Sequence, residues 1–142
     1  WWQYKGFDGR FVGVYSNISD SDKISQAISK DPACLYLGDT QSCTAFPKKF
    51  YGFYTQLAYD IFRLTNINNQ ELYIVGTYEQ YDTHASVADG YTKPEGHKVD
   101  IYNVGFAYKP HPLVILKGDY VKYAPKDAAK QNIYRFTLGW MF

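Results

Sequence analysis

The side chains that most often carry out chemistry are few in this chain and stand far apart. It contains two cysteines, Cys34 and Cys43, and three histidines, His84, His97 and His111. Structural zinc sites use cysteine or histidine pairs at close, regular spacing, and no such pair occurs here. A zinc ion shared by His84 and His97 is an alternative, but solvated loop histidines fit the spacing better. We therefore predict no metal site and no cofactor.

Catalytic motifs are also absent. The sequence has no Gly-x-Ser-x-Gly elbow, no phosphate-binding loop and no Gly-x-Gly-x-x-Gly after a predicted strand. The segment 16–47 holds several aspartates without the spacing of an EF-hand calcium loop: Asp20, Asp22, Asp31 and Asp39. The prediction is that the protein is not an enzyme and has no catalytic residues.

Both cysteines lie in this same segment, which lacks strand-like alternation. If the loop is external, its environment is oxidising, so we expect a disulfide between Cys34 and Cys43 that adds about 2–3 kcal/mol and stiffens the loop. A short helix is predicted before it, capped by Ser19 or Ser21 and ended by Pro32. Its first turn and apolar face use further residues: Asp20, Asp22, Ile24, Ala27 and Ile28.

Alternation of apolar and polar side chains dominates the rest of the chain. At the C-terminus, Tyr134, Phe136, Leu138, Trp140 and Phe142 occupy every second position. This period predicts a strand long enough to cross a bilayer at a tilt. Similar patterns predict five further strands, with residues 1–5 as the end of a seventh: 7–15, 48–62, 71–82, 100–108 and 113–123.

The predicted connections alternate between short and long. Residues 5–7, 63–70 and 109–112 are short, 16–47 and 83–98 are long, and 124–131 is intermediate. In outer-membrane barrels, short turns face the periplasm and long loops face outside. The pattern predicts an all-β, antiparallel, up-and-down transmembrane β-barrel. Tyrosines near the strand ends suit an interfacial girdle, although tyrosine also simply favours strands.

Charged residues alternate with the apolar ones and share a face with Gly, Ala and Thr. This set comprises Asp8, Arg10, Asp60, Glu79, Lys117, Asp119 and Arg135. A lipid-facing Arg or Lys at mid-depth costs about 2–4 kcal/mol, whereas a water-filled lumen avoids that cost. Our candidates for pore-lining charges are Arg10, Glu79, Lys117, Asp119 and Arg135. Alternatively, the charges pair with one another and plug a narrow barrel.

Composition excludes several other classes. The 142 residues carry 15 basic and 14 acidic side chains, so nucleic acid is not an expected partner. No run of 18 apolar residues predicts a transmembrane helix. Aromatic residues make up 19%, which argues against disorder. The mean hydropathy of −0.40 does not oppose a barrel, because barrel strands alternate. A targeting peptide is expected to be removed or to lie upstream.

The segments 51–62, 78–85, 104–120 and 136–142 resemble the C-terminal part of Gram-negative porins, closest to the phosphate-selective-porin-like group. The resemblance implies a barrel of about 16–18 strands, often a homotrimer, in the bacterial outer membrane. It also implies that Tyr134, Phe136, Leu138, Trp140 and Phe142 form the signal read by the barrel-assembly machinery. Six strands are too few to close a membrane barrel. We therefore expect residues 1–142 to be a C-terminal part of one larger barrel domain, with 16–47 as an external loop.

These inferences predict a passive diffusion channel for ions and small hydrophilic solutes. One alternative is a non-channel structural or adhesive barrel that acts through its external loops. A second is a soluble β-sandwich or carbohydrate-binding module that uses exposed Trp and Tyr. Pore radius and lumen charge would determine function only if the protein is a diffusion channel.

Overall fold

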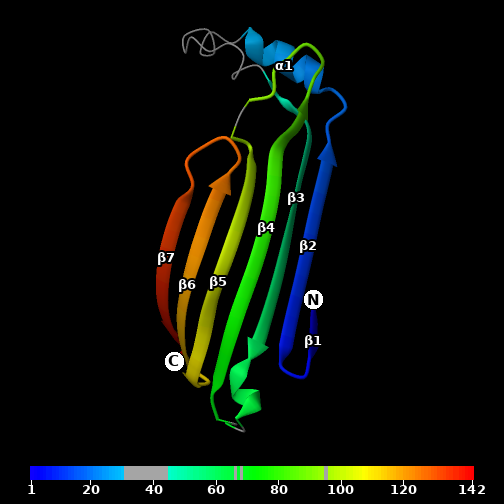
Figure 1. Cartoon of the computed structure of the whole chain (residues 1–142). Helices are drawn as coiled ribbons and strands as arrows, with labels where there is room; N and C mark the ends of the chain where they lie inside the picture. The colour runs from blue at the N-terminus through cyan, green and yellow to red at the C-terminus, as the bar shows by residue number, and fades with distance from the viewer. Residues whose placement is uncertain (31–44, 66, 68, 95) are drawn as a thin grey trace.

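A computed structural model describes residues 1–30, 45–65, 67, 69–94 and 96–142 (Figure 1). The chain forms strands with one α-helix and one 3-10 helix. In order they are β1 (Trp2–Tyr4), β2 (Phe7–Asn17), α1 (Ser21–Ser29), β3 (Pro47–Asp60), η1 (Ile61–Leu64), β4 (Glu71–Val87), β5 (Lys98–His111), β6 (Val114–Pro125) and β7 (Gln131–Trp140). No helix within the described residues is long and apolar enough to cross a membrane.

All seven strands belong to one antiparallel sheet, in which each strand pairs with the next one along the chain. This order confirms the predicted meander, including the short first strand. Short turns gather at one end of the sheet, and the longer loops with α1 gather at the other (Figure 1). Lys5 and Gly6 form the first turn with positive φ angles of 46° and 91°, as a tight hairpin requires.

The strands are longer than the alternation alone indicates. β4 continues through 83–87, which we predicted as loop, and so projects towards the long-loop end. β3 instead stops at Asp60, where the predicted strand ran to 62. The Asp60 carboxylate accepts hydrogen bonds from the backbone N–H groups of Phe62 and Leu72, both at 3.2 Å. This local capping turns the chain into η1 and ends the strand.

Helix α1 begins one residue after Asp20, which occupies the N-cap without a side-chain cap bond. The prediction of a serine cap is wrong, because Ser21 is the first helical residue and is buried. Ser25, also buried, donates to the Ser21 carbonyl at 2.8 Å and accepts from the Phe46 N–H at 3.1 Å. The buried Ser25 therefore attaches the helix to the segment before β3. Ala27, which belongs to the predicted apolar face, is exposed. Pro32, Asp31, Asp39 and the expected disulfide Cys34–Cys43 lie outside the described residues.

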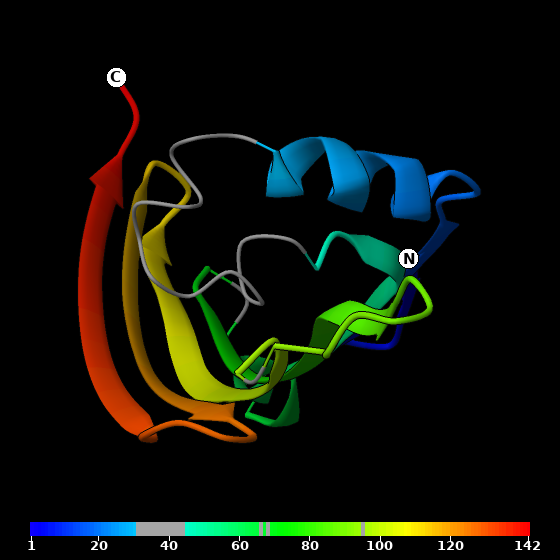
Figure 2. The ribbon, with the colours of Figure 1, turned by 90° about the horizontal axis from the view of Figure 1, so that it is seen from above.

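The sheet is strongly curved but open. Figure 2, seen from above, shows its concave side turned towards α1. In the part of the chain that the structure describes, β7 pairs only with β6, and β2 is covered by β1 only at residues 7–9. The observed architecture is thus an all-β, seven-stranded antiparallel sheet with two free edges.

Candidate functional site

The register places all seven charged residues predicted to share a face on the same side of the sheet. One row runs across six strands through Asp8, Ala58, Val75, Gly105, Asp119 and Arg135. The next row towards the loops contains Arg10, Gln56, Thr77, Asn103, Val121 and Ile133. Asp60 and Lys117 lie one row nearer the turns, and Glu79 lies further towards the loops. We call this side the polar face.

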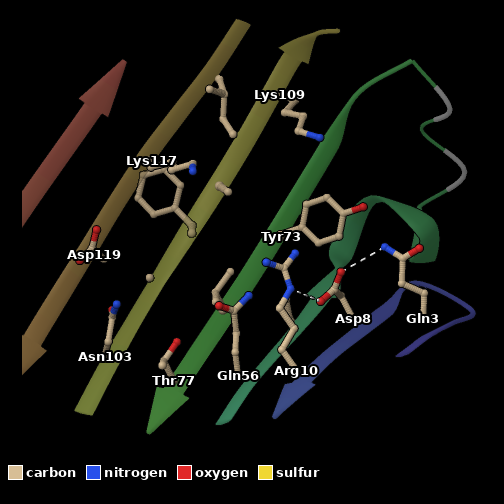
Figure 3. A pocket seen from close by; sticks show the side chains of 16 residues that line it. Gln3, Asp8, Arg10, Gln56, Tyr73, Thr77, Asn103, Lys109, Lys117 and Asp119 are labelled. Carbon is tan, nitrogen blue, oxygen red and sulfur yellow. Dashed lines mark hydrogen bonds and ion pairs between the residues drawn. The ribbon is translucent and has the colours of Figure 1, made fainter. Parts of the chain in front are cut away.

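A hollow of about 460 Å³ occupies the middle of the polar face (Figure 3). Side chains from β2 through β6, together with Gln3 of β1, line it. Because one hollow collects residues from so many strands, the polar face is the concave side of the sheet. The lining includes the small residues Ala58, Gly105 and Ala107. Charged side chains also line the hollow, among them Asp8, Arg10, Lys109, Lys117 and Asp119 (Figure 3).

Asp8 anchors one flank of this hollow. It is only 8% exposed and accepts hydrogen bonds from Trp1 Nε1 and Gln3 Nε2, both at 3.1 Å, and from Arg10 Nε at 3.2 Å. Three donors satisfy the buried carboxylate and hold the Arg10 guanidinium beside it. The sequence pattern did not identify Trp1 and Gln3 as part of this cluster. The only signal was the predicted first hairpin, in which Gln3 pairs with Asp8 and Trp1 lies next to Trp2, the partner of Gly9.

Two further ion pairs lie on the same face. Arg135 Nε donates to Asp119 Oδ2 at 2.7 Å, joining β6 to β7. Lys109 Nζ donates to Glu71 Oε2 at 2.8 Å, joining β4 to β5 near the turns. The second pair was missed because 109 was assigned to a turn, whereas β5 continues to 111.

Lys117 and Glu79 differ from these paired groups. Among the described residues, neither makes a salt bridge or a side-chain hydrogen bond. Lys117 lines the hollow opposite Ala107, while Glu79 lies beyond the hollow towards the loops. The paired charges largely cancel locally, so among the seven predicted charges Lys117 and Glu79 are the least compensated.

The opposite face, which we call the apolar face, exposes large hydrophobic side chains over its turn-end half. Examples are Phe11 at 67%, Leu57 at 59% and Val104 at 54% exposure. On β7, Tyr134, Phe136, Leu138 and Trp140 all lie on this face and are exposed, and Phe142 follows the strand. Monomeric soluble proteins rarely expose so large a contiguous apolar area.

The histidines are distributed between the two ends of the sheet. His84 and His97 meet at the loop end with ring centroids 4.0 Å apart, and Thr83 Oγ1 lies within 3.2 Å of both Nδ1 atoms. His111 lies at the turn end, where its Nδ1 accepts from the Leu113 N–H. The described residues contain no group of three or more His, Cys, Asp or Glu side chains that could hold a metal ion.

Comparison with known proteins gives one informative relative. The chain is 51% identical over all 142 residues to an uncharacterized protein of Aquifex aeolicus (strain VF5). The match covers 31% of that protein, so the chain spans about a third of the relative's length. No family model and no solved structure matches the chain.

Proposed function

We propose that this chain is part of the wall of an outer-membrane channel, through which ions and small hydrophilic solutes diffuse passively. The observation that carries the proposal is the division between the two faces of one antiparallel meander. The convex side exposes large apolar side chains, whereas the concave side is hollowed and charged. In this arrangement lipid covers the apolar face and water fills the polar side.

Consecutive apolar rows on the apolar face form the membrane belt of this proposal. These rows extend along β4 from Leu72 to Tyr78, and their partners on the neighbouring β5 extend from Tyr108 to Tyr102. At about 3.3 Å per residue this segment of β4 is roughly 20 Å long. Because barrel strands are tilted, its height is smaller than the apolar band of about 25 Å in outer-membrane barrels, so it accounts for only part of such a band. Beyond Tyr78 the same face becomes polar, with Gln80, Asp82 and the row partner Asp100. We take the belt as the membrane-spanning part and the remainder of β4 as external.

Closure of the barrel requires more strands than the seven described. Exposed strand edges cannot face lipid, because their backbone groups would lack hydrogen-bond partners. The relative that is about three times as long supports further strands in the whole protein. A soluble β-sandwich would need a second sheet over the apolar face, and the described residues form a single sheet.

Selectivity in such a channel depends on the uncompensated charges of the wall. Arg10 and Arg135 are each held by an aspartate, so their fields are largely dipolar. Lys117 projects into the hollow without such a partner among the described residues. We therefore expect Lys117 to affect ion preference more directly than the paired arginines do.

The test compares two charge reversals on one strand. Lys117→Glu changes the polar face, and Lys122→Glu changes the apolar-face side of the same β6, with the same change in net charge. In planar bilayers under a KCl gradient, Lys117→Glu should raise the cation-to-anion permeability ratio by about two- to threefold, because fixed lumen charge attracts counter-ions. Lys122→Glu should leave this ratio unchanged.

Two outcomes would contradict the channel. Equal shifts for both variants would mean that position 117 does not face the conducting path. Negligible conductance from the correctly folded, full-length protein would favour a barrel that acts through its external loops, where α1 lies across the concave side (Figure 2).

A further inference from the structure

The apolar face contains a second hollow, located where the membrane belt ends. Its volume is about 400 Å³, and its walls are almost entirely apolar or aromatic. It is lined by Leu57 of β3, Gly76 and Tyr78 of β4, Tyr102 and Val104 of β5, and Tyr120 and Lys122 of β6, among others. We call it the belt groove.

Gly76 creates this groove. In its row, Leu57, Val104 and Tyr120 present side chains on either side, so the glycine leaves a gap between them. A Cβ placed on Gly76 would meet nothing within 4 Å, which shows that no neighbouring side chain fills the gap. An alkyl chain has the shape and polarity that such a gap accepts, because it buries apolar surface on both partners.

One row further towards the loops, the walls of the groove become amphipathic. Tyr78 and Tyr102 stack with centroids 5.1 Å apart, and Lys122 lies opposite Tyr102 in the register. The Tyr78 hydroxyl donates to Asp100 Oδ1 at 2.8 Å. The groove is therefore apolar towards the turns and polar at the level of a lipid headgroup.

The charge at this level is positive. Lys98 on β5 and Lys126, the residue after β6, stand opposite each other two rows above Lys122. Among the described residues none of these three lysines makes a salt bridge. Of the nearby acids, Asp82 is paired with Lys93 at 2.7 Å, and Asp100 accepts hydrogen bonds from Tyr78 and Gln80. The Asp100 carboxylate keeps its charge because both of its donors are neutral, and Asp127 lies beside Lys126. Three lysines therefore face two acids without a described cationic partner, which leaves a small net positive charge.

We propose that the belt groove binds a phosphorylated lipid, with an acyl chain over Gly76 and its phosphate beside Lys122, extending towards Lys98 and Lys126. This proposal rests on the proposed function, because it requires the apolar face to lie in a membrane. A phosphate-bearing amphiphile complements both parts of the site: apolar surface at the glycine gap and positive charge above it. A free phosphate ion would use only the lysines, and a second copy of the chain would use only the apolar walls.

The test measures lipid retained by the full-length protein after detergent exchange, by native mass spectrometry. The probes are lipid A with two phosphates and dephosphorylated lipid A, which differ only in the phosphates. We expect bisphosphorylated lipid A to remain bound. Lys122→Glu should weaken its binding about tenfold, and Gly76→Leu should weaken it similarly by filling the gap. Lys117→Glu, a matched reversal on the polar face of the same strand, should bind it normally.

Four results would overturn the lipid site. Both variants could retain lipid A as the wild type does, or dephosphorylated lipid A could bind equally well. Inorganic phosphate at millimolar concentration could displace the lipid completely, which would show that the lysines bind the phosphate alone. Gly76→Leu could change the oligomeric state in size-exclusion chromatography, which would assign the groove to a second copy.

Conductance separates this proposal from the channel. If Lys122→Glu loses lipid binding but keeps normal conductance and selectivity, the result supports the lipid site independently of the channel. Absent conductance in wild type with intact lipid binding would contradict the channel alone. A protein that is soluble without detergent would contradict both.

Discussion

At the residue scale, the contact between His84 and His97 gives the long-loop end a pH response. Both residues lie beyond Tyr78, where the proposed membrane belt ends, and Thr83 Oγ1 lies within 3.2 Å of both Nδ1 atoms. Burial, and then the neighbouring His97, lower the pKa of His84 below its usual value of 6.5. The buried Asp82 beside it acts in the opposite direction, but Lys93 already pairs with that carboxylate at 2.7 Å.

The sign of this effect follows from proton linkage. Because the folded-state pKa of His84 is lowered, the unfolded segment binds the proton more readily, and protonation disfavours the closed contact. The stability of segment 83–97 should be fully present above pH 6.5 and decrease as the pH falls from 6.5 through the folded-state pKa. Hydrogen exchange, corrected for intrinsic rates, should show faster local opening at pH 5 than at pH 7.5. His84→Asn should remove this dependence, whereas His111→Asn at the turn end should retain it.

At the element scale, the strands were the most predictable part of the protein. The side chains that hydrogen-bond to the charged residues of the polar face were the least predictable part. Period 2 identified the strands and put Lys117, Asp119 and Arg135 on one face, because alternation fixes the side of a sheet directly. It could not identify the Asp8 cluster, which depends on Trp1 and Gln3 folding back through a two-residue turn. It also misplaced the α1 cap, because the buried serines bond to the chain before β3, which is distant in sequence.

Glycines distinguish close strand packing from open space within the same sheet. A Cβ on Gly105 would lie 2.5 Å from the Gly118 carbonyl oxygen and 2.6 Å from Asp119 Cβ. Gly105→Ala must therefore separate β5 from β6, and we expect it to lower the free energy of unfolding by about 1–3 kcal/mol. Gly76→Ala meets nothing within 4 Å and should change it by less than about 0.5 kcal/mol. Urea unfolding of the full-length protein in lipid vesicles measures both; equal costs would contradict the tight β5–β6 approach.

At the scale of the whole molecule, the proposed membrane location requires partners for the two edges that are free among the described residues. Every residue of β7 except Gly139 is exposed, and most of β2 lacks a partner on its outer side among the described residues. A closed barrel wall requires hydrogen-bonded strands along both β7 and the outer side of β2. These come either from further strands of the same polypeptide or from other copies of the chain.

The length of the relative favours closure within one polypeptide, and mass discriminates between the two routes. We expect the native protein extracted from membranes to have an intact mass roughly three times the 16.4 kDa of these 142 residues. The 142-residue segment alone, refolded into vesicles, should then remain sensitive to protease, because its edges stay unpaired. The full-length protein should instead become protease-resistant and migrate differently in gels before and after boiling. A native mass of 16.4 kDa with the same resistance would mean that several copies close the wall. The lumen would then repeat the polar face, and with it Lys117, which has no salt-bridge partner among the described residues, in every copy.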